Sequence, residues 1–184
     1  MITLGKKLKQ SEDGALSVEL ALSLPIFLMV TVGAMEFSWY FFMASSLENA
    51  VLHASRYGVT GATTENISRA DRVRQIIDEQ TFGRLNMDDL ELTTEVYEQF
   101  SDIDAPEPFE DANGDETWTT GEVFTDVNGN GIWDESLAIP GLGGGNDIVL
   151  YTARYQPGSL TGIFDWITES TIIEATIAVR NEPY

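Results

Sequence analysis

The apolar residues of this chain are concentrated in a long region near its N-terminus. Uncharged, mostly apolar residues run without interruption from Leu20 to Met35, 16 residues in all, which as a helix would span about 24 Å. That is shorter than the roughly 30 Å hydrocarbon core of a bilayer. Starting the helix at Ala15 gives 21 residues and a length of about 31 Å. The pattern therefore predicts a transmembrane helix that contains Glu19.

The helix is expected to continue beyond the membrane as a stalk. Apolar residues recur at intervals of three and four, the spacing of one helical face. They are Phe37, Tyr40, Ala44, Leu47, Val51 and Ala54. Gly58 and then Gly61 supply a stop, so we expect a transmembrane and stalk helix over residues 15–58. The aromatic residues 39–42 would lie at the outer membrane boundary, where an aromatic belt is expected.

Residues 59–184 are expected to form a small extracytoplasmic α+β domain. One segment has the spacing of an amphipathic helix, with Val73, Ile76, Ile77 and Phe82 on one side. Three segments have the alternation or β-branched content of strands. The last two are expected to form a short helical turn and a glycine-rich connector. These segments are, in that order, 68–85; 90–100, 147–155 and 171–180; 162–167; and 140–146. We expect an antiparallel sheet of three or four strands packed on the outer half of the long helix.

A basic leader precedes the apolar region. Residues 1–14 contain every lysine of the chain, and because positive charge flanking a span favours the cytoplasmic side, the N-terminus is expected in the cytoplasm. An ordinary secretory signal would place a small-residue cleavage site beyond the apolar run, and no good one follows here. The notable features are instead Gly14, the small residue Ala15, and Glu19 as the fifth residue after the glycine.

This arrangement of leader, glycine and glutamate resembles the prepilin signal of type IV pilins. The resemblance implies that a prepilin peptidase cuts between Gly14 and Ala15 on the cytoplasmic face. It also implies a role for Glu19 in assembly: a carboxylate in lipid is costly, and it would pair with the free amine of a neighbouring subunit's Ala15 when the two helices are in register. The alternative is a plain signal anchor in which Glu19 snorkels or is protonated, which explains the span but not the glycine and glutamate together.

The subfamily is indicated by the helix sequence ALSVELALSLPIFLMVTVGAMEFSWYFFMASSLENAVLHASRYG, which resembles the TadE-like pilus proteins. The shared features include Pro25, the Glu36-Phe37 pair and the closing Arg56-Tyr57, and the C-terminal ATIAVRNEPY is similar to the ends of many members. The resemblance implies a pilin or minor pilin of a tight-adherence type IV pilus, a filament of cell adhesion. Such a subunit is a single-pass inner-membrane protein before assembly and part of the extracellular filament afterwards. Its partners would be other pilin subunits and the prepilin peptidase.

An acidic insertion at residues 109–135 contains an internal repeat of period 15. Phe109, Asp111, Asn113, Asp115 and Trp118 recur as Phe124, Asp126, Asn128, Asn130 and Trp133. Oxygen side chains at alternate positions, joined by Asn-Gly turns, are what a Ca²⁺ loop requires. The two copies resemble the calcium-binding repeats of dockerin and thrombospondin type 3 proteins, so we expect a calcium-binding insertion.

The two copies differ in how completely they match an EF-hand loop. Counted from Asp111, the first copy has Glu122 at the twelfth position, although Glu116 occupies the place of the loop glycine. The second copy has Gly131 at that place but no acid at its twelfth position, so Glu135 or a ligand from the first copy would have to complete it. The candidate ligands are Asp111, Asn113, Asp115, Thr117, Glu122, Asp126, Asn128, Asn130, Ile132, Asp134 and Glu135. The alternative is a solvated acidic loop, in which the 17 acidic residues between Asn86 and Ala153 repel one another with no Lys or Arg nearby.

The composition suits an exported protein. There is no cysteine, so nothing depends on a disulfide, and the net charge of −20 argues against nucleic acid or anionic membrane surfaces as partners. Catalysis is not expected, because the single histidine, His53, lies on the stalk helix and cannot serve a Ser-His-Asp set. The leading hypothesis is a structural pilin subunit stabilised by calcium. The alternative is an unprocessed, membrane-anchored calcium-binding domain that does not polymerise.

Overall fold

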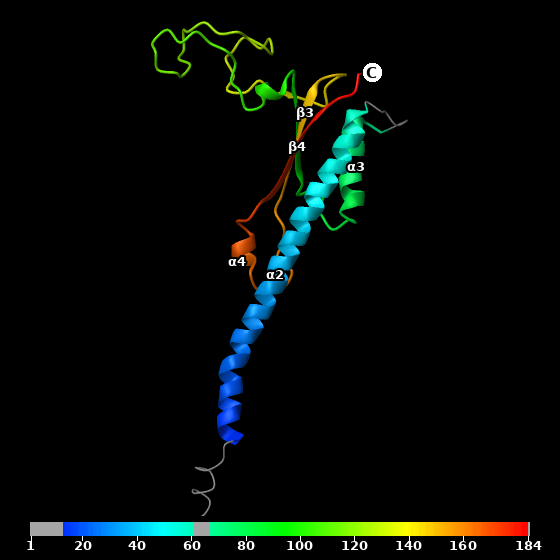
Figure 1. Cartoon of the computed structure of the whole chain (residues 1–184), viewed down its shortest axis with the longest axis vertical. Coiled ribbons are helices and arrows are strands. Elements are labelled where there is room, and N and C mark those ends of the chain that lie inside the picture. The colour runs from blue at the N-terminus through cyan, green and yellow to red at the C-terminus, as the bar shows by residue number, and fades with distance from the viewer. Residues whose placement is uncertain (1–12, 61–66, 184) are drawn as a thin grey trace, which may run out of the picture.

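The computed structural model describes residues 13–60 and 67–183, and one long helix dominates it (Figure 1). This helix, α2, runs over Asp13–Val59 and has 47 residues, a length of about 70 Å. The predicted helix over 15–58 is therefore confirmed. Every side chain from residue 14 to residue 30 is exposed, whereas the outer half of the helix is covered on one side by the rest of the chain.

The small polar side chains within the apolar half of α2 are satisfied by the helix itself. The Thr31 hydroxyl donates to the Phe27 carbonyl at 2.8 Å, and the Ser38 hydroxyl donates to the Ala34 carbonyl at 2.8 Å. Pro25 lies inside the helix and has no N–H to donate, yet the helix continues through it. Lipid offers no water to polar groups, so the polar groups of a membrane-spanning helix must find their hydrogen-bond partners within the protein.

A four-stranded antiparallel sheet packs on the outer half of α2, in the strand order β2-β1-β3-β4. The strands are β1 (Glu91–Tyr97), β2 (Ile139–Pro140), β3 (Ile148–Tyr155) and β4 (Ile173–Arg180). The three longer strands confirm the prediction. Strand β2 was not predicted. It has only two residues, at the start of the expected glycine-rich connector, and two residues are too few to show alternation.

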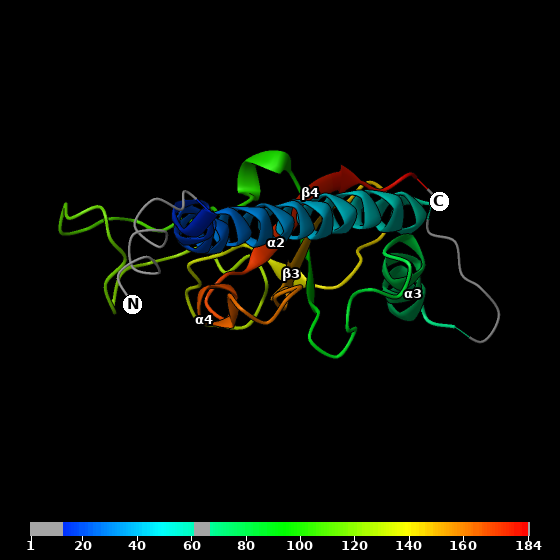
Figure 2. The same cartoon turned by 90° about the horizontal axis from the view of Figure 1, so that it is seen from below.

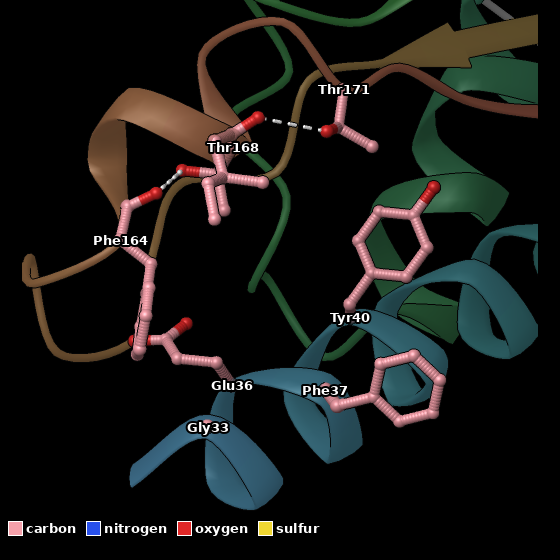
Figure 3. Close-up of a pocket in the computed structure, with 8 residues that line it drawn as sticks. Gly33, Glu36, Phe37, Tyr40, Phe164, Thr168 and Thr171 are labelled. Atoms are coloured by element: carbon pink, nitrogen blue, oxygen red, sulfur yellow. Dashed lines mark hydrogen bonds between the residues drawn. The ribbon is translucent and has the colours of Figure 1, made fainter. Parts of the chain in front are cut away.

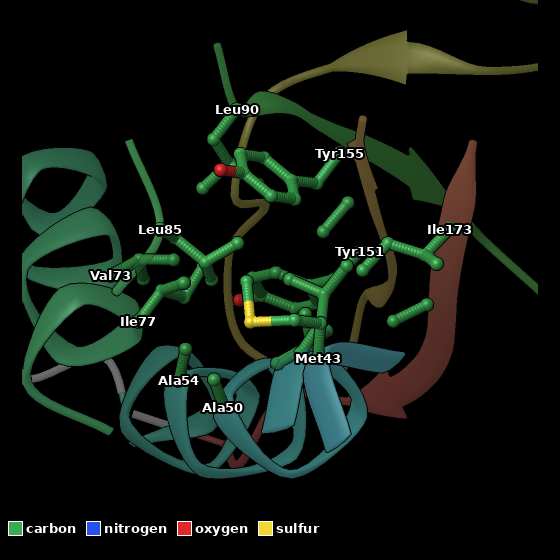
Figure 4. Close-up of a cluster of buried hydrophobic side chains, with 14 of the residues drawn as sticks. Met43, Ala50, Ala54, Val73, Ile77, Leu85, Leu90, Tyr151, Tyr155 and Ile173 are labelled. Atoms are coloured by element: carbon green, nitrogen blue, oxygen red, sulfur yellow. The ribbon is translucent and has the colours of Figure 1, made fainter. Parts of the chain in front are cut away.

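The apolar core lies between α2, the sheet and the helix α3 (Arg69–Gln80) (Figure 4). Alternate residues of a strand point to the same face of a sheet, and those of β3 and β4 that point to the helices are apolar. The buried residues are Met43, Leu47, Ala50, Val51 and Ala54 of α2, Val73 and Ile77 of α3, Leu85 and Leu90 between α3 and β1, and Val149, Tyr151, Ala153, Tyr155, Ile173 and Ala175 of the sheet. The observed structure thus has the expected α+β class, a long N-terminal helix packed against a small antiparallel sheet.

Gly58 has a packing role that was not predicted. It was expected to stop the helix, and α2 ends one residue beyond it, at Val59. A Cβ atom at residue 58 would lie 1.9 Å from Tyr151 Oη, and Tyr151 is fully buried. Gly58 therefore permits the close approach of strand β3 to the helix. The second predicted stop, Gly61, lies outside the described residues.

Helix α3 is shorter than the predicted segment 68–85. Ser68 caps its N-terminus, since its hydroxyl accepts a hydrogen bond from the Asp71 N–H at 3.1 Å. The helix ends at Gln80 because the chain turns where Phe82 and Gly83 have φ angles of +57° and +62°. This turn moves Phe82, which was expected on the apolar face, into solvent, where it is 78% exposed.

The end of α2 is tied to the C-terminal strand by Arg69 and Asn181. The Arg69 guanidinium donates to the carbonyls of Gly58 and Gly143. The Asn181 amide, which is 2% exposed, donates to the carbonyls of Leu142 and Gly144, each at 2.9 Å. These bonds fix the glycine-rich connector to the end of α2 and to the residue that follows β4.

Two short elements complete the chain. The predicted helical turn at residues 162–167 appears as α4 (Asp165–Thr168), and a 3-10 turn, η1 (Phe100–Asp102), follows β1. Seen from below, α3 and α4 lie on the same side of α2 (Figure 2). The acidic insertion projects away from the sheet at the end of the molecule farthest from the exposed half of α2 (Figure 1).

Candidate functional sites

The proposed processing site lies at the exposed beginning of α2. A Cβ atom added at Gly14 would meet no other atom within 4 Å, and Ala15 and Glu19 are exposed. Among the described residues no Lys or Arg forms an ion pair with Glu19; the ion pairs found there are Arg72–Glu79 and Arg154–Glu174. The lysines of the leader lie outside those residues. Among the described residues, Glu19 is therefore exposed and without an ion-pair partner, as a contact with another subunit would require.

The exposed half of α2 is mainly apolar, and Glu19 is its one charged side chain. By length and composition α2 is able to cross a membrane, and the most apolar stretch of the helix buries no residue against the rest of the chain. The large apolar side chains that are at least 44% exposed there are Leu16, Val18, Leu20, Leu22, Leu24, Ile26, Phe27, Leu28, Met29 and Val30. Because exposed apolar area is unfavourable in water, this surface suits membrane anchoring.

Glu36, the first residue after the apolar run, holds the loop before α4 (Figure 3). Its Oε1 atom accepts hydrogen bonds from the Ser159 hydroxyl at 2.8 Å and from the Thr161 N–H and hydroxyl at 2.7 Å and 2.5 Å. Its Oε2 atom accepts from the Leu160 N–H at 3.0 Å. Glu36 is 9% exposed, and burial by itself raises a carboxyl pKa, but the bonds from Thr161, Ser159 and Leu160 outweigh it and lower the pKa to about 2. The carboxylate is thus a charged anchor between helix and loop.

A cavity of about 300 Å³ lies beside this anchor, between α2 and α4 (Figure 3). Its walls are mainly apolar and aromatic, with Phe37 and Tyr40 from α2 and Phe164 and Ile167 from the α4 segment. His53 is exposed on α2, as expected, and lies outside the residues that line this cavity. The only histidine of the sequence is therefore not among the groups that could act as acid or base in this cavity.

The two copies of the acidic repeat fold in the same way. In the first, Asp111 Oδ1 accepts the N–H groups of Gly114 and Asp115 at 2.6 and 3.2 Å, and Oδ2 accepts that of Glu116 at 3.0 Å. In the second, Asp126 accepts the equivalent N–H groups of residues 129, 130 and 131 at 2.6, 3.1 and 2.8 Å. Glu116, which replaces the loop glycine, takes the left-handed φ of +61°. The two copies therefore have the same loop conformation, although one has Glu116 where the other has Gly131.

Aromatic residues pair the two copies with each other. Phe109 and Phe124 form an antiparallel bridge. The Trp118 and Trp133 rings are stacked at 5.1 Å and 8°. Phe109 packs edge-on against Trp133 at 6.0 Å, and Phe124 packs edge-on against Trp118 at 6.2 Å. Each phenylalanine thus contacts the tryptophan of the other copy, which gives the insertion an approximate twofold symmetry.

Two glutamates close the two loops in equivalent ways, and sequence reasoning missed one of them. Glu122 accepts the N–H groups of Ala112 at 2.9 Å and Thr119 at 2.8 Å. Glu107, which is fully buried, accepts those of Val127 at 2.7 Å and Asp134 at 3.2 Å. Each of these positions lies 15 residues from its counterpart, so Glu107 does for the second loop what Glu122 does for the first. Glu135, one of the two alternatives predicted to complete the second loop, is exposed.

The remaining candidate ligands lie within the same loops. Asn113 donates to Asp115 and Thr119, and Asn128 and Asn130 both donate to Asp134 at 2.6 Å. Thr117 donates to Asp115 at 2.8 Å. Among the residues that the structure describes, no three Asp, Glu or His side chains are gathered as a ready metal site. Asparagine side chains make up part of each set of candidate Ca²⁺ ligands. The aspartate carboxylates of these sets accept hydrogen bonds from backbone N–H groups.

Comparison with known proteins shows a similarity in the N-terminal helix. A family model described as TadE-like protein matches residues 14–56, which is most of α2 and includes Gly14, Glu19 and Glu36. No curated protein and no solved structure matches the chain. The TadE-like family is structural and associated with the Tad pilus, so the N-terminal helix of this chain is similar to that of a pilus-associated protein.

Proposed function

We propose that this chain is a structural subunit, a pilin or minor pilin, of a tight-adherence type IV pilus. The observation that carries the proposal is the exposed half of α2: residues 14–30 are all exposed, Glu19 is their one charged side chain, and they lie within the TadE-like match. Burial of apolar area is worth about 25 cal/mol per Å², so lipid would cover this surface before assembly and neighbouring helices would cover it in the filament. The N-terminus of the chain would lie in the cytoplasm before assembly.

Glu19 would act as a register check between subunits. After cleavage at Gly14, the new amine of Ala15 and the Glu19 carboxylate of a neighbour would each be costly in lipid if left alone. They pair only when the helices are correctly aligned, so the pair selects the register of assembly.

The test is the amount of Glu19→Ala protein in sheared filaments and in membranes. We expect normal membrane insertion and reduced incorporation into filaments. Ser23→Ala is the matched control, because Ser23 is also exposed on α2 and bonds only within its own helix; it should assemble normally. Incorporation of Glu19→Ala at the wild-type level would contradict the pairing and favour an unprocessed anchor that does not polymerise.

We further propose that each acidic loop binds one Ca²⁺ ion. The proposal is supported by donor sets made only of oxygen atoms, which Ca²⁺ prefers, and by the matching folds around Asp111 and Asp126. Glu122 would close the first site and Glu107 the second. Glu135 would then not be needed. A bound ion would also offset the repulsion among the acidic residues of the insertion.

Calcium binding to the folded protein should raise its melting temperature. We expect the full chain in detergent micelles to melt higher in millimolar Ca²⁺ than in chelator, and Mg²⁺ to substitute poorly because it requires a rigid octahedron. Glu107→Gln and Glu122→Gln should each abolish about half of the bound calcium measured by titration calorimetry. Glu135→Gln is the matched control and should retain all of it. Equal melting temperatures with Ca²⁺ and chelator would leave the insertion as a solvated acidic loop.

A further inference from the structure

The side of the domain that faces the exposed half of α2 carries large exposed side chains. We call Phe82, Arg84, Leu160, Ile163 and Trp166 the lower surface of the domain. Its four apolar members are 78%, 52%, 61% and 74% exposed, in chain order. We propose that the lower surface docks on the outer leaflet of the membrane that α2 crosses, with its apolar side chains at the boundary between phospholipid headgroups and acyl chains. This inference rests on the membrane anchoring in the proposed function.

The height of the lower surface along α2 is fixed by hydrogen bonds. Glu36 holds the backbone of Leu160 and Thr161, and the Trp39 indole donates to the Gly158 carbonyl at 3.3 Å. Glu36 directly follows the apolar run that ends at Met35. The loop and α4 are therefore held beside the point where α2 would leave the hydrocarbon core (Figure 1).

The lower surface is continuous with the apolar surface of the helix. Leu160 and Arg84 line one groove together with Val30 and Met35 of α2. Lipid that covers Val30 and Met35 would therefore also reach Leu160. This continuity favours phospholipid as the occupant over a separate soluble partner.

Phe82 and Arg84 add an aromatic ring and a positive charge at the same level. The Arg84 guanidinium lies 5.4 Å from the centre of the Phe42 ring and 5.6 Å from that of Phe82. Phe82 has a φ of +57°, which is unfavourable for a bulky residue, and the turn presents its ring to the outside. An arginine above apolar rings can reach a lipid phosphate while its stem stays in the apolar layer.

The chemistry of the lower surface suits a membrane interface. Tryptophan is enriched at the headgroup level because its ring is apolar and its N–H is polar. The acidic insertion projects from the opposite end of the domain (Figure 1), so its 8 acidic residues lie away from the lipid. Asp165 and Glu169 of the α4 segment border a separate polar hollow, and the hydrated headgroup region accommodates such charges.

The test measures the depth of single sites in the full chain, which has no native cysteine. Ile163→Cys, Val30→Cys and Ser101→Cys are labelled separately with an environment-sensitive fluorophore and reconstituted in phosphatidylcholine vesicles. Val30 reports the transmembrane helix, and Ser101 on η1 reports the far end of the sheet. We expect a lipid-attached nitroxide to reduce emission at positions 163 and 30, and aqueous iodide to quench only position 101 strongly.

The outcomes separate the two levels of the proposal. Quenching of position 30 but not of position 163 by the lipid nitroxide would overturn membrane docking of the lower surface and leave the anchor intact. Absence of lipid quenching at position 30 would overturn the membrane anchor, and the docking with it. Protection of position 163 that grows with the ratio of protein to lipid would show that a second copy covers this surface, and would also overturn the proposal.

Discussion

Replacing Glu36 with glutamine should loosen the contact between α2 and the loop before α4. The substitution keeps the size of the side chain but removes its charge and one of its two acceptor oxygens. Four donors converge on the carboxylate, from Ser159, Leu160 and Thr161. In either orientation of the glutamine amide, its NH₂ group would face at least one of these donors and leave it unpaired.

The magnitude follows from the pKa of Glu36. A carboxyl pKa lowered from 4.5 to about 2 corresponds to about 3 kcal/mol of stabilisation at neutral pH. Because the pKa is lower in the folded state, this stabilisation is present above about pH 4.5 and is lost as the pH falls toward 2. Hydrogen bonds to a neutral amide are about half as strong as those to a charged group, so Glu36→Gln should cost about 2 kcal/mol.

Hydrogen exchange followed by mass spectrometry measures this loss directly, because the Leu160 and Thr161 amides are donors to Glu36. A cost of about 2 kcal/mol should make these amides exchange about 30 times faster in the full chain in lipid nanodiscs. Glu174→Gln is the control, since its ion pair with Arg154 is exposed on the sheet and its loss should not affect the loop. Unchanged exchange at residues 160 and 161 in Glu36→Gln would refute the anchoring role.

Two further substitutions test the helix. Gly58→Ala would place a Cβ 1.9 Å from Tyr151 Oη, and the overpacking cost of about 1–3 kcal/mol should exceed the helix-propensity gain of about 1 kcal/mol and lower the melting temperature. Gly33→Ala, whose Cβ would meet open space, should not lower it, and equal melting of both variants would contradict the close-packing argument. Gly14→Arg should block processing and leave a membrane species that retains residues 1–14, detected by intact mass; a normally shortened product would contradict the assigned cleavage site.

Regular patterns in the sequence were sufficient to predict the main elements. The apolar run and its three-and-four spacing predicted α2, and β-branched alternation predicted the three longer strands. The same spacing was misleading at Phe82, because a turn with positive φ ends α3 before that residue. Periodicity reports which face a residue would take if the helix continued, and it does not report where the backbone turns.

The two buried glutamates, Glu36 and Glu107, differ in how far the sequence could have predicted their contacts. The partners of Glu36 lie 123 to 125 residues away in the chain, and nothing local in the sequence identifies them. Glu107 could have been found, because it lies one repeat length before Glu122; extending the repeat two residues upstream of Phe109 would have included it. The pairing of the two copies, which brings Glu107 to the second loop, required the structure.

The most direct test of the central claim is mass spectrometry of the N-terminal peptide of this chain in sheared, purified filaments. The proposed pilin function predicts that the chain is present in the filaments and begins at Ala15. Absence from the filaments, together with a membrane form that still begins at Met1, would contradict it.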